Sequence, residues 1–142
     1  MFKHCLTALA VVGLSTSALA DDPNVNPGMW ETTSTVTLDS PQFSLPPQTQ
    51  SSSDCITADD VAQGDAFMEE NEECEITNKD IRSDGMSYSM SCNNPDGSTM
   101  AMDAEMSFDG DSMTGTVDGQ MESAMGAMTM KVEISGERTG DC

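Results

Sequence analysis

Histidine is almost missing from this 142-residue sequence, and the only one is His4. Beyond the first 20 residues this excludes a Ser-His-Asp triad, a Cys-His pair, a histidine general base and a zinc–histidine site. Two carboxylates could still act as in a glycosidase, but among 25 Asp and Glu residues no pair stands out. The sequence therefore predicts a protein that is not an enzyme and carries no cofactor.

Basic residues are also scarce, since five Lys and Arg oppose the 25 acids and give a formal net charge of −20. Such a surface repels nucleic-acid phosphates and anionic lipid headgroups, so we expect neither as a partner. The densest acidic run, residues 68–75, is interpreted as a solvated face. Asp109 and Asp111 lack the later ligands of a calcium loop and are interpreted as part of a β-turn.

Long apolar runs are missing as well, because none reaches the roughly 20 residues of a membrane span. The run at residues 5–14 follows the basic Lys3 and precedes the small residues Ala18 and Ala20. This layout is typical of a secretory signal peptide. We therefore expect a signal peptide at residues 1–20, a single β-rich domain at residues 21–142, and a periplasmic or secreted location.

Cysteine spacing lacks the C-x-x-C pairs of zinc sites, which argues against metal ligation by thiolates. An even number of cysteines in an exported chain instead predicts disulfides. The stretch from Cys74 to Cys92 resembles a hairpin that would place these two residues opposite one another, at the separation a disulfide needs. Sequence alone permits other pairings, but this one leaves Cys55 to bond Cys142.

Alternating apolar and polar residues, punctuated by Gly, Asn, Asp and Pro, predict an all-β fold with one short helix. The helix is expected over residues 57–70, with Thr57 as its N-cap and Phe67 on its apolar side. We expect an antiparallel meander, curled into a half-barrel or small barrel and stapled by disulfides. Its strands are predicted at residues 29–38, 49–55, 74–81, 86–92, 99–108, 112–120 and 127–138.

Methionine is abundant, with 13 residues, whereas Leu, Ile and Val are few. Met100, Met102 and Met106 share one strand face with Phe108, while Asp103 and Glu105 fall on the other. A flexible thioether fills gaps in a core well. We therefore expect these three methionines to be mostly buried and the two acids to be exposed.

Copper binding is the alternative interpretation of the methionines. The M-x-M pairs Met100/Met102 and Met128/Met130 each place two thioethers on one strand face, and two adjacent strands could present four soft ligands to Cu(I). Core packing is the favoured interpretation, because copper sites usually recruit a histidine or cysteine as well.

Three motifs carry a family resemblance: "NPGMWETTSTVTL" (residues 26–38), "DCITADD" (54–60) and "SGERTGDC" (135–142). Together with the four cysteines, they resemble the exported bacterial proteins of domain of unknown function family 3617. The resemblance implies a small periplasmic or secreted protein with no established activity, cofactor or catalytic residue. It also implies that Trp30 and Glu31 begin the first strand and that Arg138 ends the last.

These motif residues have structural interpretations of their own. Trp30 is the only tryptophan and is expected to anchor the core. Arg138 could pair with Glu31 if the first and last strands are neighbours.

The function expected from the sequence is therefore non-enzymatic. We expect an exported binding or envelope-associated domain whose curled sheet holds an apolar or amphiphilic ligand or docks a partner. The alternative is a periplasmic copper-binding protein. The oligomeric state is left open.

Overall fold

The structure is a computed structural model that describes residues 22–63 and 72–142. The predicted signal peptide, residues 1–20, and the later part of the predicted helix, including Phe67, lie outside the described residues. No helix within these ranges is long and apolar enough to cross a membrane.

Seven strands and one short helix make up the described chain. The helix, α1 (Ala58–Gln63), begins after Thr57, whose hydroxyl accepts a hydrogen bond of 3.2 Å from the backbone N–H of Asp60. This is the N-cap interaction expected from the sequence. The strands are β1 (Gly28–Asp39), β2 (Gln48–Ile56), β3 (Cys74–Ile81), β4 (Gly85–Asn93), β5 (Thr99–Phe108), β6 (Ser112–Ser123) and β7 (Gly126–Gly140).

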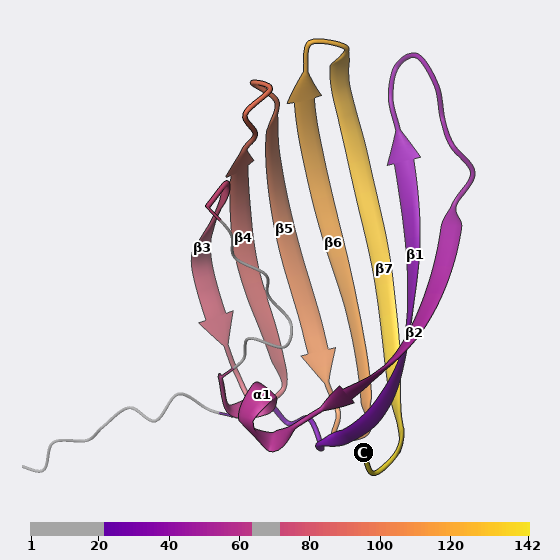
Figure 1. Ribbon diagram of the computed structural model, residues 1–142, viewed down its shortest axis with the longest axis vertical. Helices are drawn as coiled ribbons and strands as arrows, with labels where there is room; N and C mark the ends of the chain where they lie inside the picture. The colour runs from indigo at the N-terminus through magenta and orange to yellow at the C-terminus, as the bar shows by residue number, and fades with distance from the viewer. Residues whose placement is uncertain (1–21, 64–71) are drawn as a thin grey trace, which may run out of the picture.

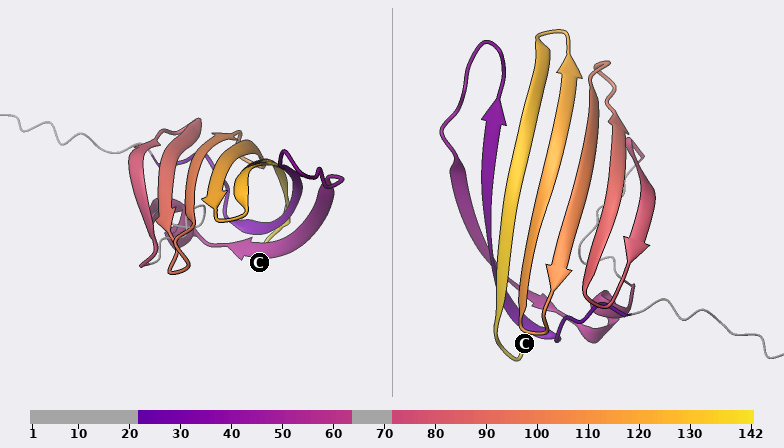
Figure 2. Two further views of the ribbon diagram at one scale, coloured as in Figure 1. Left: turned by 90° about the horizontal axis from the view of Figure 1, so that it is seen from above. Right: turned by 180° about the vertical axis from the view of Figure 1, so that it is seen from behind.

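All seven strands form one antiparallel sheet in the order β2-β1-β7-β6-β5-β4-β3. Strands β3 to β7 form a meander, and the β1–β2 hairpin joins it where β1 pairs with β7. The sheet curls into a half-barrel when seen from above (Figure 2). Within the described chain the sheet is not closed, and β2 and β3 are its edges. The predicted mainly-β, disulfide-stapled fold is confirmed, and of the two predicted shapes the half-barrel is the one observed.

The two ends of the half-barrel differ. The second half of β2 crosses in front of the sheet toward α1, at the end where Cys142 also lies (Figure 1). We call this the helix end. The opposite end, which holds the turns at residues 94–98 and 124–125 and the β1–β2 loop, is the open end.

The strands present alternate residues to the two faces of the sheet. On β5, Ala104, Met106 and Phe108 are buried, whereas Asp103 and Glu105 are exposed. The convex face is accordingly polar and acidic, and the concave face carries the apolar residues.

The core lies at the helix end of the concave face. Trp30 and Met86 are among its largest fully buried side chains, and the indole N–H of Trp30 donates a hydrogen bond of 2.9 Å to the carbonyl of Asn26. Burying each such side chain stabilises the fold by about 1.5–3 kcal/mol. The cluster consists of Val25, Trp30, Val61, Met86, Met106, Phe108 and Met113.

The open end of the concave face differs from the core. All three methionines are mostly buried as expected, but Met100 and Met102 are buried less deeply than Met106. The reason is their position along the strand, since α1 and the second half of β2 cross the concave face at the helix end (Figure 1). Six methionines are half-buried at the open end: Met90, Met100, Met102, Met121, Met128 and Met130.

Candidate functional site

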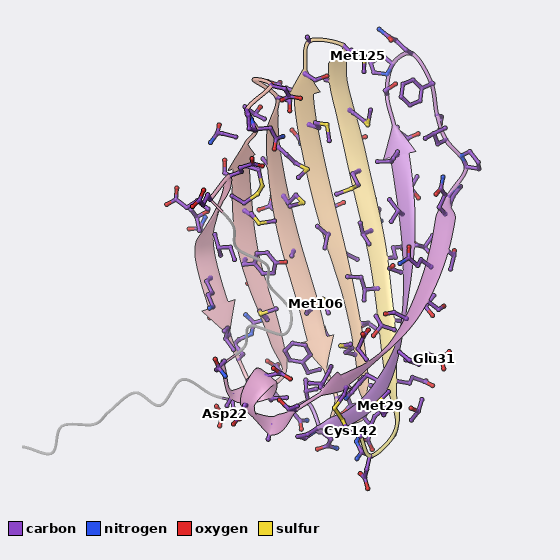
Figure 3. The ribbon with its side chains drawn as sticks, in the orientation of Figure 1. Asp22, Met29, Glu31, Met106, Met125 and Cys142 are labelled. Atoms are coloured by element: carbon purple, nitrogen blue, oxygen red, sulfur yellow. A yellow bond between two sulfur atoms is a disulfide. The ribbon has the colours of Figure 1, made fainter. Side chains whose placement is uncertain are left out.

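A pocket of about 550 Å³ lies on the concave face beside the core. Trp30 contributes to its wall, and Met106 lines it from near the C-terminal end of β5 (Figure 3). The rest of its apolar lining comes from β2 and from β4 to β7: Cys55, Ile56, Tyr88, Ala104, Met113, Val117 and Ile134. Its polar lining comes from β1, β2 and α1: Thr32, Ser52, Asp54 and Asp60.

Glycines opposite methionines shape the apolar side of the pocket. Gly115 of β6 is the cross-strand partner of Met106, and a Cβ at this position would overlap the Met106 sulfur. Gly136 of β7 is likewise opposite Met113, and a Cβ there would lie 2.6 Å from the Met113 Cε atom. Each methionine side chain therefore lies over the glycine of the neighbouring strand, where no other side chain takes up the space.

The polar side of the pocket carries two carboxylates, Asp54 on β2 and Asp60 on α1. One oxygen of Asp60 accepts hydrogen bonds from the Thr57 hydroxyl at 2.6 Å and from the Thr57 backbone N–H at 2.8 Å. These bonds favour the charged form and lower the pKa of Asp60 below its ordinary value of 3.8. Asp60 is therefore a carboxylate at neutral pH.

The residues at the two ends of the domain meet beside this pocket. Arg138 lies on β7 opposite Trp30 of β1. Its Nε atom donates a hydrogen bond of 2.7 Å to the carbonyl of Pro27, and one of its terminal nitrogens lies 2.5 Å from a carboxylate oxygen of Asp141. The first and last strands are thus fastened by a charged side chain as well as by their backbone ladder.

Two disulfides join the cysteines of the described chain. Cys74 bonds Cys92 directly across the β3–β4 pair, and Cys55 at the end of β2 bonds Cys142. These are the two pairs that the hairpin pattern favours. Because structural disulfides form in oxidising compartments, they indicate a chain that folds outside the cytoplasm.

A family model described as "Protein of unknown function (DUF3617)" matches residues 25–142. The matched range includes both Pro27 and Arg138, which are in contact at the β1–β7 junction. The chain belongs to this family. No curated protein and no solved structure matches it. In this DUF3617 chain the start of the first motif lies at the helix end together with the other two motifs.

One expected contact in this DUF3617 motif is wrong. The first and last strands are neighbours, but Glu31 does not pair with Arg138. Glu31 lies opposite Glu137, one position away, and so the two residues face opposite sides of the sheet. Arg138 bonds Asp141 and Pro27 instead.

The structure explains why glycine occupies position 28 of the Pro-Gly-x-Trp motif. Its φ angle is +152°, and a Cβ at this position would overlap the Gly140 carbonyl oxygen and lie 2.5 Å from the Arg138 Nε atom. Only glycine lets the arginine approach the Pro27 carbonyl so closely. The motif therefore allows close packing of β1 against β7.

The predicted copper ligands lie on one face, but not on neighbouring strands. Met100 and Met102 are on β5, Met128 and Met130 are on β7, and β6 separates them. The proposed arrangement of two adjacent strands is therefore wrong. Among the described residues, no group of three or more His, Cys, Asp and Glu could hold a metal ion.

The sequence led us to expect a ligand within the curled sheet, but it did not identify the residues that line the pocket. Its polar residues, Asp54 and Asp60, were interpreted as part of a strand end and a helix start, with no link between them and the apolar face. The sequence of β6 does contain an indication of the pocket, because Gly115 and Gly119 face the same side of the sheet as Met113. Glycines on an inward-facing phase mark places where larger neighbours reach across a sheet.

Proposed function

We propose that this protein is a non-enzymatic binding protein whose concave pocket holds a small amphiphilic molecule with a cationic or hydrogen-bond-donating head. The observation that carries this proposal is the pocket beside Trp30, whose lining combines apolar side chains with the carboxylates of Asp54 and Asp60. Its volume of about 550 Å³ falls within the usual range for small-molecule sites, about 300–1,000 Å³.

The two sides of the pocket favour different parts of one ligand. Met106, Met113 and Val117 offer an apolar surface to a hydrocarbon body. Asp54 and Asp60 accept hydrogen bonds or pair with a positive charge, and Asp60 is held in its charged form by Thr57. The net charge of −20 adds a long-range attraction for cations and repels anionic amphiphiles.

A binding role agrees with the composition of the chain. The only histidine is His4, which lies far along the sequence from every residue that lines the pocket. We further propose a periplasmic or secreted, envelope-associated location, supported by the disulfides and by the signal-peptide pattern of residues 1–20.

Trp30 provides the test, because it is the only tryptophan and lies in the pocket wall. The disulfide-bonded protein is titrated with decyltrimethylammonium and, separately, with decanoate, both below their micellar concentrations. We expect a saturable change in tryptophan fluorescence with the cationic amphiphile and a much weaker response to the anionic one. No saturable change with either compound would contradict the proposal.

Two matched variants locate the binding. Val117→Phe places a larger side chain in the pocket, whereas Val36→Phe makes the same change on the same face outside it. We expect only Val117→Phe to abolish the response. Asp60→Asn should weaken binding of the cationic amphiphile without weakening that of decanoate. Equal losses in the two phenylalanine variants would contradict binding in this pocket.

A further inference from the structure

The open end of the concave face carries a concentration of thioethers that the proposed pocket does not use. The six half-buried methionines lie in two neighbouring rows across β4 to β7. In the first row Met100 is opposite Met121, which is opposite Met128. In the second row Met90 is opposite Met102, which is separated from Met130 only by Gly119.

Gly119 brings two of these side chains together across the strand that separates them. A Cβ at Gly119 would lie 3.2 Å from the Met130 Cε atom and 3.4 Å from the Met102 Cγ atom. The two side chains therefore lean from β7 and β5 over the same point of β6. Met121, two residues along β6, faces the same side beside them.

Core packing does not account for this group in the way it accounts for the methionines of the helix end. Met86, Met106 and Met113 are buried in the cluster around Trp30. None of the six open-end methionines is among the half-buried side chains of the described chain that pack against that cluster. These six residues are therefore incompletely buried, and they lie on one surface.

We infer that the open end of the concave face binds one soft monovalent cation, Cu(I), through the thioethers of Met102, Met121 and Met130. Met100 and Met128 flank these three residues. Thioethers are soft ligands that select Cu(I) over hard cations, and no proton has to leave a thioether before it binds a metal. The acidic surface of the chain, with its net charge of −20, raises the local concentration of cations.

This site differs from the four-residue set suggested by the M-x-M pairs. Its central ligands come from three consecutive strands, and Met102 and Met130 reach one another because Gly119 has no side chain. The nearest cysteines, Cys74 and Cys92, are joined in a disulfide and offer no thiolate. The coordination is therefore by sulfur of thioethers alone.

The test is a titration of the disulfide-bonded protein with Cu(I), kept reduced by ascorbate and buffered by a chromogenic chelator. We expect one equivalent to bind. Met102→Leu/Met130→Leu should weaken binding by at least about tenfold, since even the loss of a group that only supports a metal ligand costs that much. Met29→Leu/Met86→Leu removes two thioethers at the helix end and should leave the affinity unchanged.

Two further readouts keep the result interpretable. Binding of decyltrimethylammonium in the Met102→Leu/Met130→Leu variant reports that the fold and the separate pocket are intact. X-ray absorption of the copper-loaded protein should show sulfur ligands only. Absence of Cu(I) binding below millimolar concentrations, equal losses in the two double variants, or a copper shell of nitrogen and oxygen would overturn the inference.

Discussion

The Nε atom of Arg138 lies 2.7 Å from the carbonyl oxygen of Pro27, so a side chain of β7 holds the backbone that leads into β1. The two residues are far apart in the sequence, yet they belong to the two motifs that resemble the family most clearly. Their contact gives a structural meaning to both motifs, because it fastens the β1–β2 hairpin to the meander of β3 to β7.

Replacing this arginine should therefore destabilise the whole sheet. Arg138→Ala removes the bonds to Pro27 and Asp141, and we expect the free energy of unfolding to fall by about 1–3 kcal/mol. The matched control is Arg82→Ala, because among the described residues the ion pairs of Arg82 are with the nearby exposed acids Asp80 and Asp84. Denaturant unfolding with both disulfides intact measures the two effects. Equal losses would contradict a special role for Arg138.

The glycine–methionine packing of the pocket predicts a coupled pair of mutations. Gly115→Ala forces the Met106 side chain to move and should cost about 1–3 kcal/mol, and Met106→Ala alone should cost about 2–5 kcal/mol. The double variant should cost less than the sum by about 0.5–3 kcal/mol, because the new methyl group occupies space that Met106 vacates. Gly140→Ala, with no atom near the added Cβ, is the control and should be close to neutral. Strictly additive losses would contradict the packing.

The two disulfides should contribute unequally. Cys55–Cys142 closes a separation of 87 residues and Cys74–Cys92 one of 18 residues. In the chain-entropy model the longer loop restricts the unfolded state by about 1.4 kcal/mol more. Paired Ser substitutions at each bridge, compared by denaturant unfolding, measure this difference. A larger loss from removing the short bridge would contradict the entropic account.

The pH dependence of the helix start follows from Asp60. Its folded-state pKa is lowered, chiefly by the Thr57 hydroxyl, so its contribution to stability is present above pH 3.8 and is lost as the pH falls through the folded-state pKa. An NMR titration of the Asp60 carboxyl should give a midpoint below 3.8, and Thr57→Val should move it toward 3.8. Ser98→Ala changes the similar contact of Asp96 and should leave Asp60 unchanged. An Asp60 midpoint unaffected by Thr57→Val would contradict this assignment.

Parity along the strands predicted much of this fold from sequence. Because alternate residues of a strand face opposite sides, the pattern of Met106 and Phe108 against Asp103 and Glu105 gave both the strand and its buried face. The predicted strand limits agree with the observed ones to within a few residues. A short-range pattern is sufficient for such features, because they depend on neighbours in the sequence.

The features that sequence did not predict depend on contacts between distant segments. Parity shows which face Met100 and Met102 occupy, but it cannot show that α1 and β2 cross only the other end of that face. The suggested Glu31–Arg138 contact is wrong for a similar reason. The first and last strands are neighbours, which was the condition for this contact, but the register that places Glu31 opposite Glu137 is set by the ladder as a whole.

The most direct test of the binding account is an NMR spectrum of the protein with ¹³C-labelled methionine methyl groups. The methionines report on separate regions: Met106 and Met113 on the pocket, Met125 on an exposed turn, and Met29 on the end of β1 (Figure 3). Addition of decyltrimethylammonium should shift the signals of Met106 and Met113 and leave those of Met29 and Met125 in place. Unchanged signals for Met106 and Met113, at concentrations that saturate the fluorescence change of Trp30, would contradict it.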